Sequence, residues 1–474
     1  MTKTDPAAAT GGFPRTFWTA NFVELLERAA YYGVFIVITL YLSRILGFDD
    51  VQAAWISGAF SAGLYFLPTF SGALADKMGF RNALLLAFGL LSIGYLSLAL
   101  FPLMLESQGL VEYARTVTYT GLLEADIRWA IIPIMVVIMI GGSFIKAVIT
   151  GTVATTTTEA NRAKGYAIFY MMVNIGAFSG KTIVKPLRES MGDLGLVNLN
   201  YFAAAMTALA FISILLFFRN VERSGESKSM QEVWQALLKV LTNGRLIMLI
   251  IIITGFWMVQ HQLYATMPKY VLRMAGEGAS PSWYANVNPF VVVCTVGAVT
   301  ALMKRKTALF SMTVGMFIMP ISALSMASGN LIGHDINLGF MSMHPIAFMM
   351  IVGIAFQGFA ESFISPRFLE YFSLQAPKGE EGLYLGFSHL HSFISSVLGF
   401  GISGYLLDAY CPDPRKFESH EAWQAAAVNA HYIWYVFAGI ALTAAIALII
   451  YGRVVRRLDE KQAALKRLEP EYAD

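Results

Sequence analysis

Two acidic side chains and one basic side chain lie close together in a stretch that otherwise has the composition of a membrane-spanning helix. They are Glu24, Glu27 and Arg28, at the start of ELLERAAYYG, residues 24–33. With Tyr31 they follow the i, i+3, i+4, i+7 spacing, which places four side chains on one helical face. Charges at membrane depth cost several kcal/mol each unless they pair or face water. Two carboxylates that share one guanidinium can hold a proton or exchange it for an ion pair, which is the chemistry that a proton-coupled carrier needs.

More charges lie inside other apolar runs. Lys146 ends GGSFIK, residues 141–146, and Glu361 lies in GFAES, residues 358–362. At about 1.5 Å per residue, Glu27 and Lys146 both lie about 15 Å from the same membrane edge, and Glu361 lies near the middle. We interpret these opposite charges as ion pairs that form and break as two halves of the molecule move, because an inert pair would stabilise a bundle poorly.

His261 lies between Gln260 and Gln262, at about the depth of Glu361. Three consecutive polar side chains at that depth cannot all face lipid. Two interpretations stay open: the imidazole takes up a proton during function, or it stays neutral and hydrogen-bonded. For His389 and His391, which lie nearer a helix end, we expect structural roles.

The composition is that of a polytopic membrane protein. Of 474 residues, 56% are hydrophobic and 14% are charged, with a mean hydropathy of +0.58. Soluble domains carry about 25% charged residues. The net charge of +3 is spread over loops, so we expect no nucleic-acid partner. We find no phosphate-cradling loop, metal-ligand spacing, nucleophile–base pairing or cysteine framework, so we expect neither an enzyme nor a metal site, and no cofactor beyond protons as the coupling ion.

Apolar segments of about 20 residues predict an all-α fold with about twelve transmembrane helices in the lipid bilayer. The expected spans are 17–46, 54–75, 81–104, 130–156, 163–187, 198–219, 245–272, 284–303, 307–327, 344–374, 382–408 and 430–455. A polar and then amphipathic stretch at 220–244 divides them into two six-helix bundles, 1–219 and 245–474. Basic loops occupy matching places in the two bundles, which indicates a duplicated architecture with the substrate site between the halves.

Lysine and arginine gather on one side, in the loops after the second, fourth and eighth spans and in the tail. That side should be cytoplasmic, so we expect an integral protein of a bacterial inner membrane with both termini inside. We expect it to be monomeric. The loop with Lys185 and Arg188 runs against the charge trend.

Asp76 and Arg81 lie in a tight turn on the cytoplasmic side, where we expect them to lock neighbouring helices.

Six motifs occur in the order found in one family of carriers. They are ELLERAAYYG (24–33), the Tyr65-to-Asp76 segment, GSFIK (142–146), FYMMVNIG (169–176), SWYANVNP (282–289) and GFAESFISP (358–366). In this respect the chain resembles the proton-dependent oligopeptide transporter family of the major facilitator superfamily. The resemblance covers most of the chain and implies the twelve-helix major facilitator fold.

The resemblance also implies roles for individual residues. Arg28 and Lys146 would receive a substrate carboxylate, and Glu361 would receive the substrate amino group. Proton coupling would fall to Glu24 and Glu27 with Arg28. The remaining substrate contacts would come from Tyr31, Tyr32, Tyr65, Asn174 and Asn288.

The chain departs from the family pattern at several places. His261 stands where the family commonly carries a glutamate in the seventh helix, which leaves a histidine as the candidate proton carrier there. Ala147 follows the lysine of the fourth helix where proline is common. The segment 220–244 is too short for the two extra helices that bacterial members often carry.

These features lead to one expected function and two alternatives. The expected function is a symporter that uses protons to import di- and tripeptides by alternating access. The first alternative is a related carrier for another small carboxylate or anion, because a protonated His261 would favour an anion. The second is a receptor or scaffold with a transporter fold, which the buried titratable cluster around Glu27 argues against.

Overall fold

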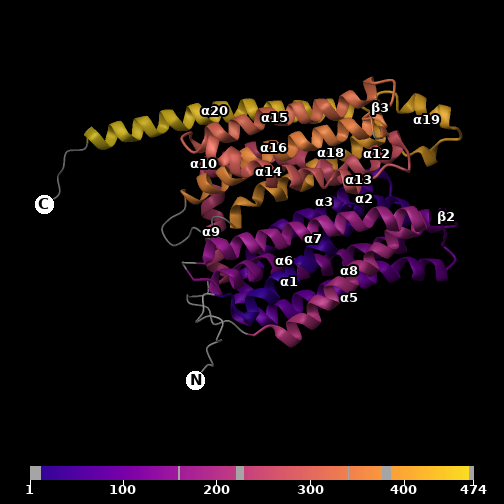
Figure 1. The fold of residues 1–474 in the computed structure, drawn as a ribbon, viewed down its shortest axis with the longest axis horizontal. Helices are drawn as coiled ribbons and strands as arrows, with labels where there is room; N and C mark the ends of the chain where they lie inside the picture. Colours follow the sequence, from indigo (N-terminus) through magenta and orange to yellow (C-terminus); the bar gives the residue numbers. More distant parts are fainter. Residues whose placement is uncertain (1–11, 159–160, 220–228, 340, 376–385, 469–474) are drawn as a thin grey trace.

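The computed structural model of the chain describes residues 12–158, 161–219, 229–339, 341–375 and 386–468 (Figure 1). Residues 1–11, the first part of the linker (220–228) and the start of the expected span at 382–385 lie outside these residues. The described chain is almost entirely helical, because an apolar run in lipid can satisfy its backbone hydrogen bonds within a helix.

The N-terminal half holds the helices up to the linker, which lie together in the lower part of the view (Figure 1). Their bounds are α1 (Arg15–Phe35), α2 (Ile38–Leu40), a π-helical turn (Tyr41–Ile45), α3 (Asp50–Phe66), α4 (Pro68–Met78), α5 (Phe80–Ser107), α6 (Ile131–Thr155), α7 (Arg162–Met191) and α8 (Leu194–Phe217).

The C-terminal half follows the linker helix α9 (Met230–Thr242) and fills the upper part of the view (Figure 1). Its bounds are α10 (Gly244–Gln260), α11 (Gln262–Ala265), α12 (Met267–Ala275), α13 (Pro281–Tyr284), α14 (Val287–Met303), α15 (Ala308–Ser328), α16 (Pro345–Ser373), α18 (Leu390–Tyr410), α19 (His420–Ala426) and α20 (Tyr432–Leu468).

The two ends of the bundle differ in what they carry. We call one the hairpin end, because it carries the strands β1 (Val111–Tyr113) and β2 (Val117–Tyr119), which pair antiparallel, together with α19 (Figure 1). The strands β3 (Ile336–Asn337) and β4 (Ser342–Met343) form a second antiparallel pair. The linker end carries α9 and the last turns of α20. Short 3-10 turns complete the loops at Leu122–Glu124, Asp126–Ala130, Gly329–Leu331 and Pro414–Lys416. The two small hairpins are the only described exceptions to the expected all-helical chain.

The expected transmembrane helices are confirmed. Ten described helices are each long and apolar enough to cross a membrane, and α1 with the helical residues 38–45 forms an eleventh span, bent by 44°. The expected span at 54–75 falls on α3 and α4, which join at Leu67 and together cover about 40 Å. Large apolar side chains such as Ile93, Leu216 and Phe290 are exposed, as is common for residues of membrane helices.

The last helix is longer than expected. The expected span ends at residue 455, but α20 continues to Leu468. The added turns are polar and rich in good helix formers, so they extend the helix beyond the apolar span. An i,i+4 ion pair between Arg456 and Glu460 supports them, and Asp459 pairs with Arg245 on α10.

Breaks in two helices shape the space between the halves. The first span bends after Phe35, and the π-helical turn that follows presents Ser43 and Arg44. The seventh span is interrupted at His261 and again at Thr266, before Pro268, so α12 runs separately and carries Lys269 and Arg273. These irregular segments supply much of the hairpin-end contact described below.

Close packing of α1 on α7 depends on glycine. A Cβ added at Gly180 would overlap the carbonyl oxygen of Ala29 and the backbone of Gly33. Small residues at such crossings let two membrane helices approach closely. This crossing fixes the position of the α7 residues that follow Gly180.

We predict that Gly180→Ala destabilises the folded protein by about 1–3 kcal/mol, because the added methyl forces two helices apart. Thermal unfolding of the detergent-solubilised protein, followed by size-exclusion fluorescence, measures the change. The matched control is Gly297→Ala on α14, where a Cβ meets nothing within 4 Å. Equal midpoints for the two variants would contradict the packing argument.

Candidate functional site between the two halves

The cluster on α1 is assembled as the spacing predicted. Arg28 Nε lies 3.2 Å from Glu24 Oε1 and also forms an ion pair with Glu27 Oε2. Both glutamates are buried. One carboxylate oxygen of Glu24 has no hydrogen-bond partner among the described residues. The cluster therefore buries two acids against one guanidinium, and a single added proton would balance it.

Lys146 on α6 reaches the other half of the molecule. Its Nζ lies 3.1 Å from Nε2 of His389, just before α18. A lysine ammonium can only donate, so this bond needs a lone pair on the imidazole. Lys146 also interacts electrostatically with Glu24 and Arg28. An acidic partner was expected for Lys146 and a structural role for His389, so this contact between the halves was not anticipated.

Glu361 on α16 is held within the C-terminal half. Its Oε2 accepts hydrogen bonds from Gln260 Nε2 at 3.0 Å and from Asn288 Nδ2 at 3.4 Å. A Cβ at Gly358 would meet the Asn288 carbonyl oxygen at 2.7 Å, so that glycine lets α14 and α16 approach there. The structure thus brings together two expected substrate residues, Glu361 and Asn288, and adds Gln260.

His261 is enclosed by rings. Only 4% of its surface is exposed, and its Nδ1 lies 3.3 Å from Ser395 Oγ. The Tyr65 ring stacks on it at a centroid distance of 6.0 Å and on His389 at 6.4 Å. Tyr65 from α3 therefore links the imidazoles of the seventh and eleventh spans. In this conformation the surroundings of His261 suit a neutral, hydrogen-bonded ring.

The other expected contacts differ in their placement. Tyr31 and Tyr32 pack edge to face, and Tyr32 approaches Tyr264 of the C-terminal half at 6.4 Å between ring centroids. Asn174 instead donates its amide to the Tyr170 carbonyl oxygen one turn earlier on its own helix.

The expected helix-locking turn makes contacts within the N-terminal half. Arg81 donates from Nε to the Phe218 carbonyl oxygen at 3.2 Å and from Nη2 to that of Leu215 at 3.0 Å. These bonds tie the start of α5 to the last turn of α8. Asp76 lies one turn earlier, near the end of α4.

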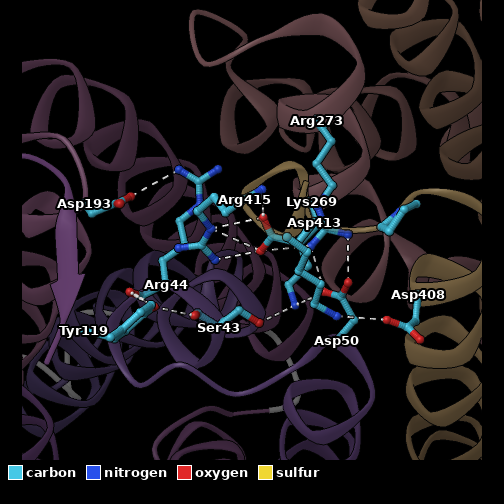
Figure 2. A network of polar contacts seen from close by, with 12 residues as sticks. Ser43, Arg44, Asp50, Tyr119, Asp193, Lys269, Arg273, Asp408, Asp413 and Arg415 are labelled. Carbon is cyan, nitrogen blue, oxygen red and sulfur yellow. Dashed lines mark hydrogen bonds and ion pairs between the residues drawn. The ribbon is translucent and has the colours of Figure 1, made fainter. Parts of the chain in front are cut away.

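At the hairpin end, a buried ion cluster joins the two halves (Figure 2). Asp50, at the start of α3, accepts from Lys269 Nζ at 2.8 Å. Arg273 donates to both oxygens of the same carboxylate, at 2.9 and 2.8 Å. Lys269 also donates to Ser43 Oγ at 2.6 Å. All three charges are shielded from solvent, and a bidentate guanidinium–carboxylate pair is among the strongest such contacts.

A second ion cluster lies nearby. Arg44 bridges Asp193 of its own half, at 3.1 Å, and Glu277 of the other half, at 2.5 Å. Arg188 donates to Glu277 at 2.7 Å. Burial alone would raise the pKa of Glu277, but the hydrogen bonds and charges of Arg44 and Arg188 outweigh it and lower that pKa. These pairs therefore stabilise the closed end at neutral pH, and their contribution is lost only as the pH falls through and below the ordinary carboxyl range of about 4.

Lys185 and Arg188, expected in a loop that ran against the charge trend, lie instead within α7. Arg188 serves there as an ion partner across the halves, and Lys185 pairs with Glu189 on its own helix.

A cavity of about 700 Å³ lies among these residues, lined by both halves. It includes Arg44 and Lys269 but neither Glu27 nor Glu361, so it is a vestibule at the hairpin end and not the site of the central charges. Together the contacts define a molecule that is closed at its hairpin end.

Sequence reasoning missed the interface roles of three cations and of one neutral imidazole. Lys269 and Arg273 hold Asp50, His389 receives Lys146, and Lys181 on α7 is buried between the halves. For Lys181 and Lys269 a signal was present, because both are charges inside or next to expected spans, the same rule that selected Glu27.

Comparisons with known proteins agree with this architecture. The model of the Major Facilitator Superfamily matches residues 20–336 and 336–471. The dipeptide and tripeptide permease B of Salmonella typhimurium is 23% identical over 462 residues, which cover 83% of this chain and 86% of that protein. The crystal structure of the transporter PepTSo superposes with a TM-score of 0.67 at 18% identity, covering 94% of this chain and 99% of that one. A tetrameric crystal form of PepTSo2 gives 0.66 at 19% identity, with the same coverage.

Since the family model spans nearly the whole described chain, the protein belongs to the major facilitator superfamily and is an integral membrane transporter. Within that superfamily it is a divergent member of the proton-dependent oligopeptide transporter family, so the resemblance drawn from the six motifs is confirmed.

We predict that Asp50→Asn loosens the hairpin end, because it leaves Lys269 and Arg273 buried without their carboxylate, a change that typically costs about 3–5 kcal/mol. The readout is the rate at which a maleimide labels Ser282→Cys, a buried hairpin-end position, in protein whose Cys294 and Cys411 have been replaced. We expect labelling at least about tenfold faster.

The control for this experiment is Asp49→Asn. Asp49 caps α3 by accepting from the Gln52 backbone, and asparagine caps helices equally well. The neighbouring substitution should therefore leave the labelling rate unchanged. Equal rates in the two variants would show that the Asp50 cluster does not hold the halves together.

Proposed function

We propose that this protein is a proton-coupled symporter that imports di- and tripeptides by alternating access. The observation that carries the proposal is the buried α1 cluster, in which Glu24 and Glu27 share the single guanidinium of Arg28. The cluster holds one more carboxylate than it has guanidinium groups. A carrier that takes up a proton on one side of the membrane and releases it on the other would use this extra carboxylate to hold the proton.

A peptide is a zwitterion whose two charged ends are separated by a nearly fixed length. Arg28 and Lys146 would bind its carboxylate from the N-terminal half, and Glu361 would bind its amino group from the C-terminal half. Such a ligand bridges both halves and favours their closure around it. Tyr31, Tyr32 and Tyr65 would line the site, with hydrogen bonds from Asn174 and Asn288.

The coupling step would use competition for Arg28. When the substrate carboxylate takes the guanidinium, the glutamates lose their ion partner, and a buried carboxylate without a partner favours its protonated form. Protonation of Glu24 or Glu27 and substrate binding would therefore support each other. His389 would give up Lys146 to the substrate in the same step.

In the membrane, we propose that the linker end is cytoplasmic, with both termini inside. The protein would lie in a bacterial inner membrane, and one chain would be the transport unit. The closed hairpin end then corresponds to a state that faces the cytoplasm. Movement of the halves would break the Asp50 and Glu277 clusters and open the vestibule to substrate.

A second candidate is a carrier of the same fold for another small carboxylate or anion. Lys146 is bonded to a histidine, and Lys181 is buried with no acidic ion-pair partner among the residues that the structure describes. Both cations favour this candidate because both could receive an anion. Counterflow in proteoliposomes separates the two functions. Separate batches of proteoliposomes are loaded with unlabelled Ala-Ala, N-acetylated Ala-Ala or one of a panel of small carboxylates, and each batch is offered the same compound in labelled form. Exchange of the free dipeptide with little exchange of the acetylated one supports peptide transport, and exchange of carboxylates alone supports the anion carrier.

We predict that Glu27→Gln abolishes peptide accumulation driven by an inward proton gradient, while exchange of labelled for unlabelled peptide stays within about threefold of wild type. Exchange needs binding and movement of the halves but no net proton transfer. Glu112→Gln, at an exposed position on β1, is the control that should change neither activity. Accumulation against a gradient by Glu27→Gln would remove Glu27 from the coupling role.

We predict that His261 takes up a proton in another conformation of the cycle, so that His261→Gln flattens the dependence of uptake on pH, because glutamine keeps a hydrogen-bonding side chain but cannot take up a proton. His261→Glu should restore stronger gradient-driven accumulation. Initial rates measured between pH 5 and 8 test this, with the exposed loop residue His334 changed to glutamine as the control. If wild type and His261→Gln give the same profile, His261 is a structural residue and coupling rests on the glutamates.

A further inference from the structure

Lys181 is a buried ammonium at the interface between the halves. The residue is 2% exposed. Its Nζ lies 3.4 Å from the carbonyl oxygen of Ala285, 5.0 Å from the ring centre of Tyr32 and 6.0 Å from that of Tyr264. Ala285 and Tyr264 belong to the C-terminal half, so this cation is enclosed by both halves in the closed state.

Its position follows from the helix crossing next to it. Gly180 packs on the backbone of Ala29 and Gly33, which holds α7 tightly against α1 at this level. The next side chain on α7 then meets Tyr32 of α1 and the facing segments of the C-terminal half. Lys181 lies seven residues beyond Asn174, about 10 Å further toward the hairpin end. It therefore forms part of the wall that closes the proposed peptide site on that side.

Lys269 is an equally buried lysine whose partners differ from those of Lys181. Both lysines are 2% exposed, but Lys269 pairs with Asp50 and donates to Ser43. Among the residues that the structure describes, Lys181 has one long bond to a carbonyl and two ring faces, and no carboxylate within ion-pair distance. Cation–π contacts offset only part of the cost of burying an ammonium.

The acid that acts on Lys181 electrostatically is Glu361. Glu361 does not pair with it directly, because its carboxylate is hydrogen-bonded to the amides of Gln260 and Asn288. An anion brought by the ligand would complete the surroundings of Lys181. It would lie near Glu361, on the side where the amino-terminal residue of a bound peptide is expected.

We propose that Lys181 is a substrate-contacting residue that binds a second carboxylate of the peptide, the side chain of an acidic first residue. The inference rests on the proposed peptide transport and adds charge selectivity to it. Glu361 and Lys181 together match an amino-terminal aspartate or glutamate, which carries an ammonium and a carboxylate close together. A first residue with a basic side chain would meet the like charge of Lys181 and bind more weakly.

The test is competition for uptake of labelled Ala-Ala into proteoliposomes by unlabelled Asp-Ala, Ala-Ala and Lys-Ala. Wild type should be inhibited more strongly by Asp-Ala than by Lys-Ala. In Lys181→Met this preference should fall about tenfold, the effect expected for loss of a charge-assisted contact, while inhibition by Ala-Ala changes less than about threefold. Lys181→Arg should keep the preference.

The matched control is Lys185→Met, one turn further along α7, where the lysine is partly exposed and pairs with Glu189. It should keep the wild-type preference. If Lys181→Met does not fold, Lys181→Gln takes its place, and if neither folds, wild type alone decides through its preference between Asp-Ala and Lys-Ala. An unchanged preference in the Lys181 variants, an equal loss in Lys185→Met, or no preference in wild type would overturn the assignment. Wild type that takes up no peptide would refute the proposed function itself.

Discussion

The structure depends on the high cost of a charge without a partner in a low-dielectric interior. Many buried charges of this chain find their partners in the opposite half: Lys269 and Arg273 on Asp50, Arg188 and Arg44 on Glu277, and Lys146 on His389. Each such pair exists only while the halves are together at that level. The arrangement of charges therefore decides which conformations are stable, and the apolar helices serve as two stiff bodies that carry them.

The same constraint links the central residues to the ends of the molecule. Three ionic groups on α1 lie within one half, so they persist when the halves move, and their unbalanced acid stays available to a proton. The groups that bridge the halves must exchange partners instead. The equilibrium between conformations then depends on the substrate charges, on the bound proton and on the hairpin-end ion pairs together. The movement of the two bundles is the only mechanical link that this coupling needs.

Much of this could be predicted from the sequence, and the limits have physical causes. Spacing on one helix fixes local geometry, so the sharing of Arg28 by Glu24 and Glu27 followed from residue numbers alone. Hydropathy placed the spans, and motif order indicated the family. The partner of Lys146 could not be predicted, because contacts between halves depend on tertiary packing at a broken seventh span and at the start of α18. The full length of α20 was missed because polar residues that follow an apolar run carry no hydropathy signal. Lys181 was overlooked although it is a charge inside an expected membrane span, which is the criterion that singled out Glu27.

The central claim is that charge pairing holds the hairpin end closed while the linker end can separate, and that protons and substrate shift this balance. Electron paramagnetic resonance between spin labels tests it most directly, in protein freed of Cys294 and Cys411. One pair, Thr118 and Gln424, reports on the hairpin end, and another, Lys77 and Arg305, reports on the linker end; all four positions are exposed. The account predicts that Asp50→Asn lengthens the first distance and shortens the second, and that Ala-Ala at acidic pH changes the two distances in opposite directions in wild type. Distances that change together, or not at all, would contradict it.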